Sequence, residues 1–243
     1  MPADSRVATT TLHVSPGATP DAPARVRTTT GLLAARILQL APGRARVALV
    51  ATGALLLGGD ALRLEVVVED GTRLDLLDVA ATVAYPGRGA SASWRADLRV
   101  GEGSSLTWLG EPLVVAAGSE VDRVLTAEVA DGGRLALRDT LVLGRSGEDG
   151  GLLRARTELA HGGRPALVED LRAGGPVDIP DLCVLGGHRV VDQVTTVGQS
   201  RVAEAPDGCT HLQLVAPGWA MRWLGQEAHR SPLGPLASAV AQS

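Results

Sequence analysis

The chain of 243 residues contains no phenylalanine, no lysine and no asparagine. Without lysine there can be no P-loop lysine, no Schiff-base lysine and no pyridoxal attachment site. Because aromatic residues make up only 2% of the chain, valine, leucine and alanine must fill most of the core. Valine is β-branched and packs better on a pleated sheet than in a helix, which favours an all-β fold.

Cysteine, net charge and long apolar runs are also scarce. Two cysteines do not make a disulfide framework, and a net charge of -4 argues against nucleic-acid binding. Residues 1–20 lack the apolar core of a signal peptide. The longest apolar runs, such as Val47–Val50 and Ala54–Leu57, are far too short to span a membrane. We therefore expect a cytoplasmic protein that binds neither nucleic acid nor a membrane.

A turn with a central glycine recurs along the chain, and strand-forming residues flank each copy. Glycine can adopt the positive φ that such turns require. The last three clear copies are 14 or 15 residues apart, which fits a strand, a turn and another strand. The spacing alone favours a meander of antiparallel hairpins, and coiled or stacked β layers are the alternative. The clear copies centre on Gly71, Gly103, Gly118 and Gly132, and a looser one on Gly162.

No linker divides the chain, so the sequence predicts one domain over residues 1–243. Residues 1–30 read as a strand followed by a proline-rich loop. Near the other end, Trp219, Met221 and Trp223 recur with period two and should share one face of a strand. Ser231 with Pro232 resembles a helix start, which predicts a short helix within residues 231–243.

Motifs for catalysis or tight metal binding are weak. The serines at 146 and 200 lack the glycine spacing of a nucleophile elbow, and Gly101-Glu-Gly103 lacks the third glycine of a dinucleotide fingerprint. Cysteine and histidine could bind nickel or zinc if neighbouring strands brought them together, but no paired metal-ligand spacing occurs. The weak metal candidates are Cys183, His188, Cys209 and His211.

Three carboxylates adjoin apolar stretches. Asp60 follows Gly58, Gly59 and the run Leu55–Leu57, Asp139 interrupts the apolar stretch Leu135–Leu143, and Glu169 follows the run Ala166–Val168. An unpaired carboxylate is costly to bury, so each should be solvated or paired inside, and the residues alone favour a solvated face for all three. In a regular strand, Asp139 and its neighbour Arg138 point to opposite faces.

Several segments, in one order over roughly residues 30–225, resemble the urease accessory protein D family, also called H. Leu55–Asp60 is similar to its Gly-Gly-Asp signature, Gly87–Gly103 with Trp94 to its second block, and Leu106–Val115 to its central strand block. Leu141–Arg145 resembles its Leu-Gly-Arg block, and Arg156–Leu171 its Gly-Arg-Pro turn. The chain departs from the family in lacking lysine and in a shortened C-terminus.

The resemblance implies an all-β fold, with mainly antiparallel strands in stacked or coiled, β-helix-like layers and one or two short helices, one near the C-terminus. It implies a non-enzymatic chaperone that binds apo-urease, the accessory F protein and the accessory G GTPase. It also implies that no cofactor is tightly bound and that nickel passes through or along the assembly, with an internal polar tunnel as one route. The candidates for nickel transit or partner contact are Gly58, Gly59, Asp60, Glu111, Asp139, Arg145 and Glu169.

Two other functions remain open from the residues alone. A metal-dependent β-barrel or jelly-roll enzyme would need histidines and carboxylates that converge on one pocket. A generic β-sandwich module would bind carbohydrate or protein without any link to urease.

Overall fold

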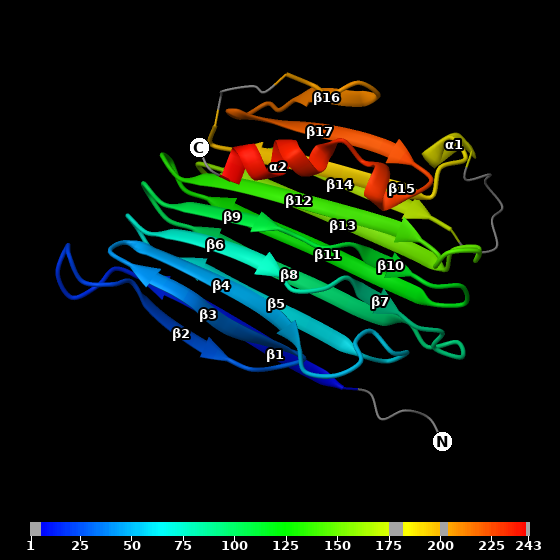
Figure 1. Cartoon of the computed structure of the whole chain (residues 1–243), viewed down its shortest axis with the longest axis horizontal. Coiled ribbons are helices and arrows are strands. Elements are labelled where there is room, and N and C mark those ends of the chain that lie inside the picture. The colour runs from blue at the N-terminus through cyan, green and yellow to red at the C-terminus, as the bar shows by residue number, and fades with distance from the viewer. Residues whose placement is uncertain (1–5, 175–181, 200–203, 242–243) are drawn as a thin grey trace.

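Two β-sheets lie face to face in the computed structural model, which describes residues 6–174, 182–199 and 204–241 (Figure 1). The seven-stranded sheet has the order β14 (Arg164–Ala173), β13 (Leu152–His161), β11 (Glu120–Val129), β8 (Ala92–Val100), β5 (Ala61–Val68), β1 (Val7–Ser15) and β2 (Arg25–Thr29). The ten-stranded sheet has the order β16 (Cys209–Gln213), β17 (Gly218–Gly225), β15 (Val190–Val197), β12 (Arg134–Leu143), β9 (Ser105–Leu109), β6 (Arg73–Asp78), β4 (Arg44–Ala51) and β3 (Leu33–Ala41). Beside this path, β10 (Leu113–Val115) pairs with β12 and with β7 (Thr82–Ala84).

The helices are short, and two of the three lie near the C-terminus. They are α1 (Leu182–Leu185), the 3-10 helix η1 (Ala228–Arg230) and α2 (Leu233–Ala241). Helix α2 crosses the outer face of the ten-stranded sheet, where it contacts β9, β12 and β15 (Figure 1). No helix among the described residues is long and apolar enough to cross a membrane.

The expected all-β class and the stacked, β-helix-like layers are confirmed, but the direction of the central strands is not the expected one. Strands β5, β8, β11 and β13 pair in parallel, and so do β4, β6, β9 and β12. Antiparallel pairs flank this parallel centre, as in β1–β2, β3–β4, β13–β14 and β12–β15. A parallel pair needs a crossover between its strands, and here each crossover passes through the opposite sheet.

The glycine turns explain this parallel pairing. The turns at Gly71, Gly103 and Gly132 each lead from the seven-stranded sheet into the ten-stranded sheet, and the turn at Gly118 leads back. All four glycines have positive φ, from 62° to 73°. The hairpin interpretation is therefore wrong for these four turns. Each turn joins two strands that lie in different sheets and do not pair with each other. The turn at Gly162, between β13 and β14, does close a hairpin.

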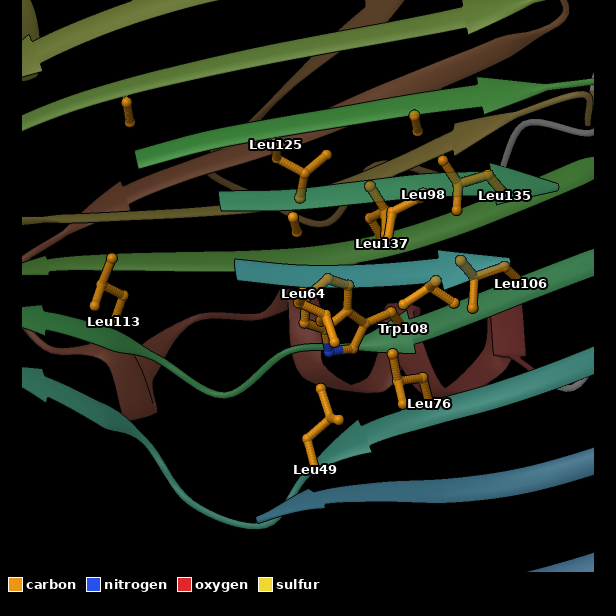
Figure 2. Packing of buried hydrophobic residues seen from close by; sticks show 14 of the residues in the cluster. Leu49, Leu64, Leu76, Leu98, Leu106, Trp108, Leu113, Leu125, Leu135 and Leu137 are labelled. Carbon is orange, nitrogen blue, oxygen red and sulfur yellow. The ribbon is translucent and has the colours of Figure 1, made fainter. Parts of the chain in front are cut away.

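The main core lies between the sheets. Alternate residues of each strand point inward, so leucines of the seven-stranded sheet, such as Leu64, Leu98 and Leu125, face Leu76 and Leu106 of the ten-stranded sheet (Figure 2). At about 25 cal/mol per Å² of buried apolar surface, this layer is the main stabilising contribution. Aliphatic side chains supply nearly all of it, as the composition predicted.

A second core lies on the outer face of the ten-stranded sheet. Trp219 and Met221 of β17 are fully buried there with Leu233 and Ala237 of α2, and Trp223 packs beside them. The prediction of a shared face for these β17 residues is confirmed. The predicted C-terminal helix is confirmed as α2, and the Ser231 hydroxyl accepts a hydrogen bond from the Leu233 amide at 3.2 Å.

Candidate functional site

Three cavities follow one another between the sheets. The outer cavity, of about 310 Å³, shares Asp78, Thr82, Trp94 and Trp108 with the middle cavity, of about 50 Å³. The middle cavity shares Arg123, Leu125, Leu137 and Asp139 with the inner cavity, of about 80 Å³. Even the smallest can hold a few water molecules. We call this series the interior passage.

The charged pair Arg123–Asp139 lies in the centre of the interior passage. Arg123 projects inward from β11 and Asp139 from β12, and Arg123 Nη2 lies 3.0 Å from Asp139 Oδ2. The Arg123 guanidinium also lies over the ring of Trp94, with 4.5 Å from its carbon to the ring centroid. Trp94 in turn stacks against Trp108 at 6.1 Å. A charged group is thus held inside an otherwise aliphatic core by one carboxylate and one aromatic face.

Asp139 is enclosed by protein, yet 31% of its side-chain area is open to space. The two observations agree if that space is the interior passage and not bulk solvent. Burial raises the pKa of Asp139, and the nearby carboxylates of Asp192 and Glu169 act in the same direction, against the lowering effect of Arg123 and Arg222. Asp139 therefore takes up a proton more readily than an exposed aspartate does.

Asp78 marks the boundary between the outer and middle cavities. Burial raises the pKa of Asp78 to about 6. Two hydrogen bonds oppose the rise: the Trp108 indole donates to Oδ1 at 3.2 Å and the Glu111 amide donates to Oδ2 at 3.1 Å. Asp78 lacks an ion pair with an arginine among the described residues.

A second polar group lines the inner cavity. Glu169 of β14 forms an ion pair with Arg222 of β17, and the Arg222 Nε donates to the side-chain oxygen of Gln193 at 2.9 Å. Gln193 donates to the Thr195 hydroxyl at 3.0 Å. The interior passage therefore has carboxylates along its length, at Asp78, Asp139 and Glu169, and the last two are neutralised by arginines.

The structure brings together three of the seven residues that the sequence singled out. Asp139 and Glu169 line the inner cavity, and Glu111 lines the middle cavity. Gly58, Gly59, Asp60 and Arg145 line none of the three cavities.

Asp60 instead anchors the N-terminal segment. Its carboxylate is buried, accepts a hydrogen bond from Arg6 Nε at 3.0 Å and one from the Leu57 amide at 3.0 Å. Gly58 packs so closely on Gly87 that an added Cβ would lie 2.3 Å from the Gly87 Cα. The Gly-Gly-Asp segment therefore has a structural explanation in loop packing, separate from any role in transit.

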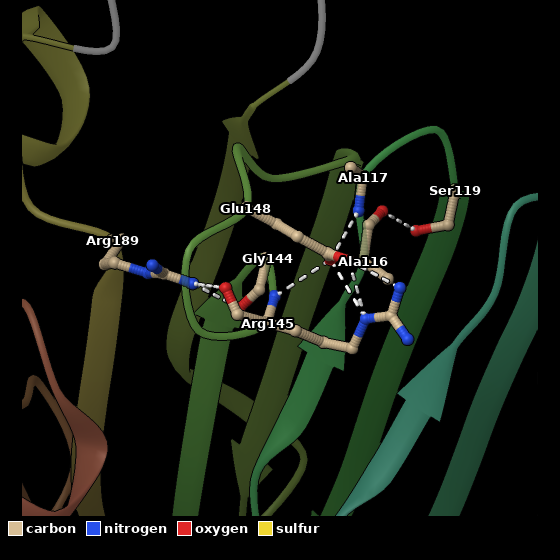
Figure 3. Close-up of polar contacts among 7 residues, drawn as sticks. All are labelled: Ala116, Ala117, Ser119, Gly144, Arg145, Glu148 and Arg189. Carbon is tan, nitrogen blue, oxygen red and sulfur yellow. Dashed lines mark hydrogen bonds and ion pairs between the residues drawn. The ribbon is translucent and has the colours of Figure 1, made fainter.

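Arg145 lies in the exposed loop between β12 and β13. It forms an ion pair with Glu148 at 2.5 Å, and the Glu148 carboxylate also accepts a bond from the Ala117 amide at 3.4 Å (Figure 3). Hydrogen bonds from Arg145 lower the pKa of Glu148 to about 2. Arg189, the residue before β15, donates to the carbonyl oxygens of Gly144 and Arg145 and ties the loop to the start of that strand.

Ligands for a tightly bound metal do not converge in the part of the chain that the structure describes, where no three His, Cys, Asp or Glu side chains form a metal-binding group. Cys209 is a half-buried free thiol, His211 is exposed on β16, and His188 follows α1. Cys183 belongs to α1, and its side chain lies outside the described residues. The converging ligands that a metal-dependent enzyme would need are thus not seen in these residues.

Asp78, Arg123, Gln193 and Arg222 also line the interior passage, although the sequence analysis did not select them. In each of their strands, residues two positions away point into the core, so these polar side chains lie on the same inward face. Arg123, for example, lies between Val121 and Leu125, which are both buried. A polar residue at an apolar position of a period-two pattern is the signal that could have found them.

Comparison with known proteins identifies the family of the chain. Residues 7–233 match the family described as UreD urease accessory protein. Urease accessory protein UreD 1 of Streptomyces griseus is 46% identical over 200 residues, which cover 81% of this chain and 76% of the relative. Urease accessory protein UreD of Streptomyces avermitilis is 36% identical over 215 residues, covering 86% of this chain and 79% of the relative. The chain belongs to the UreD urease accessory protein family.

Proposed function

We propose that this protein is a non-enzymatic scaffold that delivers nickel to apo-urease in the cytoplasm through its interior passage. It acts in a complex with the accessory F protein and the accessory G GTPase, and it has no tightly bound cofactor. The observation that carries this proposal is the series of cavities with carboxylates at Asp78, Asp139 and Glu169. Membership of the UreD family supports the role in urease maturation.

The ligand chemistry of the interior passage suits transit better than storage. Carboxylate oxygens are hard ligands, whereas thiolates and imidazoles hold nickel more strongly. Asp139 and Glu169 are already paired with arginines, so an arriving cation must compete with a guanidinium at each. This competition keeps any one site weak, which allows release to the next.

Exposed apolar side chains near both ends of the interior passage support docking of partners there. Val79 and Tyr85 line the outer cavity and Val184 lines the inner cavity, and all three are exposed. Apolar side chains that remain in water at an opening gain free energy when a partner covers them.

Neutral substitutions inside the interior passage test the proposal. Urease would be activated in cells that co-express the accessory proteins with wild type, Asp139→Asn or Glu169→Gln. We expect both variants to co-purify with their partners and to lower urease activity and nickel content severalfold. Matched controls are Asp170→Asn and Glu158→Gln, which remove exposed carboxylates paired with Arg156. Full activation by both interior variants, at limiting nickel, would overturn the proposal.

A further inference from the structure

Arg123 lies at the only junction shared by the middle and inner cavities among the described residues. Its side chain is 5% exposed and projects from β11 toward Asp139 of β12, across the space between the sheets. Leu125 and Leu137 form the remaining shared lining, and neither offers a polar atom. Any ion that moves between the two cavities must therefore pass the guanidinium.

The guanidinium is held on two sides only. Nη2 lies 3.0 Å from Asp139, and the planar group covers Trp94 at 4.5 Å. Nη1 is buried and has no hydrogen-bond partner among the described residues. A buried donor without a partner is unfavourable, so the closed position of Arg123 is less stable than that of a fully bonded arginine would be.

We propose that Arg123 is a plug in the interior passage, which an arriving divalent cation displaces from Asp139. The plug rests on the proposed function, because it has a purpose only if cations use the interior passage. A cation at Asp139 repels the guanidinium and takes over its carboxylate, and the long side chain of Arg123 can turn away from Trp94 without a backbone change. Without a cation, the same guanidinium keeps the two cavities apart.

Trp94 and Trp108 line both the outer and the middle cavity, so an ion can quench them before it reaches Arg123. The part of the quenching that Asp139→Asn abolishes reports a cation at Asp139, and the expected quenching rates refer to that part. Purified protein, alone or in its complex with partners, would be mixed rapidly with Ni²⁺, which quenches indole emission at short range, and with Mg²⁺ as a control ion. Trp219 and Trp223 lie on the outer face of the ten-stranded sheet and give a background common to all variants. The variant is Arg123→Gln, and the matched control is the exposed Arg156→Gln.

We expect Ni²⁺ to quench Arg123→Gln about tenfold faster than wild type or Arg156→Gln, the change that a barrier lower by about 1.4 kcal/mol produces. Equal rates in wild type and Arg123→Gln would overturn the plug and leave the interior passage intact. Quenching limited to the Trp219 and Trp223 background in every variant would overturn the interior passage itself. If Arg123→Gln does not fold, Arg123→Lys replaces it, because an ammonium cannot cover Trp94 as a planar group does; here we expect faster quenching by about threefold.

Discussion

The indole nitrogen of Trp108 donates a hydrogen bond to Asp78 Oδ1 across 3.2 Å, from β9 to the end of β6. The acceptor is the carboxyl group of Asp78, and burial raises its pKa to about 6. The Trp108 ring also stacks on Trp94. It is thus hydrogen-bonded to a carboxyl group whose pKa is about 6. The charge state of the boundary between the outer and middle cavities depends on this pair.

The first prediction concerns the pH dependence of stability. The folded pKa of Asp78, about 6, lies above its ordinary value of 3.8, so the folded state holds the proton more tightly than the unfolded state. Stability from Asp78 is therefore fully present below about pH 4 and is lost as the pH rises through 6. The shift of about two pKa units corresponds to about 3 kcal/mol.

Urea unfolding of wild type and Asp78→Asn at several pH values measures this effect. The free energy of unfolding of wild type minus that of Asp78→Asn should fall by about 2 kcal/mol between pH 4 and pH 7. Any constant cost of the asparagine cancels in the slope. A difference that does not change with pH would contradict the raised pKa.

The second prediction concerns the ion pair Arg6–Asp60. Asp60 is buried and Arg6 is partly exposed, so removal of either leaves the other without its partner. We expect Asp60→Ala to lower the free energy of unfolding by about 2–4 kcal/mol. A double-mutant cycle with Arg6→Ala should give a coupling above about 1 kcal/mol, whereas the exposed pair Arg95–Asp97 should give less. Additive effects of Arg6→Ala and Asp60→Ala would show that the pair is not an anchor.

How much of the site the sequence predicted depends on the strand pattern. Asp139 and Glu169 adjoin apolar runs, but only the family resemblance made them transit candidates, because the strand pattern alone favours solvated carboxylates there. The opposite orientation of Arg138 is confirmed by its ion pair with Asp192 on the outer face of the ten-stranded sheet. Arg123 was missed although it stands in an equally regular apolar pattern. The pattern of one strand gives the face on which a side chain lies, which is local information.

Strand pairing, and contacts between residues far apart in the chain, could not be predicted from the sequence for a physical reason. A glycine turn fixes the backbone locally, but a hairpin and a turn between two sheets differ only in where their strands pair. The same holds for Arg6 and Asp60, which are 54 residues apart in the chain. The turns at Gly162 and Gly132 have similar flanking residues. The first joins β13 and β14, which pair as an antiparallel hairpin, whereas the second joins β11 and β12, which lie in different sheets.

The third prediction concerns the close approach of two loops at Gly58 and Gly87. A Cβ at position 58 would lie 2.3 Å from the Gly87 Cα, which is backbone and cannot turn aside. We expect Gly58→Ala to destabilise the fold by about 2–4 kcal/mol through overpacking. Gly53→Ala is the matched control, because nothing lies within 4 Å of its added Cβ. Thermal unfolding of both variants decides the question, and equal melting temperatures would show that the loops separate freely.

The fourth prediction concerns the attachment of α2 to the ten-stranded sheet. Leu233 is fully buried against Trp219 and Met221, whereas Leu236 on the same helix is half-buried. We expect Leu233→Ala to cost about 3 kcal/mol, because it leaves a cavity under the first turn of the helix, and Leu236→Ala to cost about 1 kcal/mol. Chemical denaturation followed by tryptophan emission measures both, since Trp219 and Trp223 lie in this core. Equal effects of the two substitutions would mean that α2 is not fixed through Leu233, and that the second core does not hold the helix against β15.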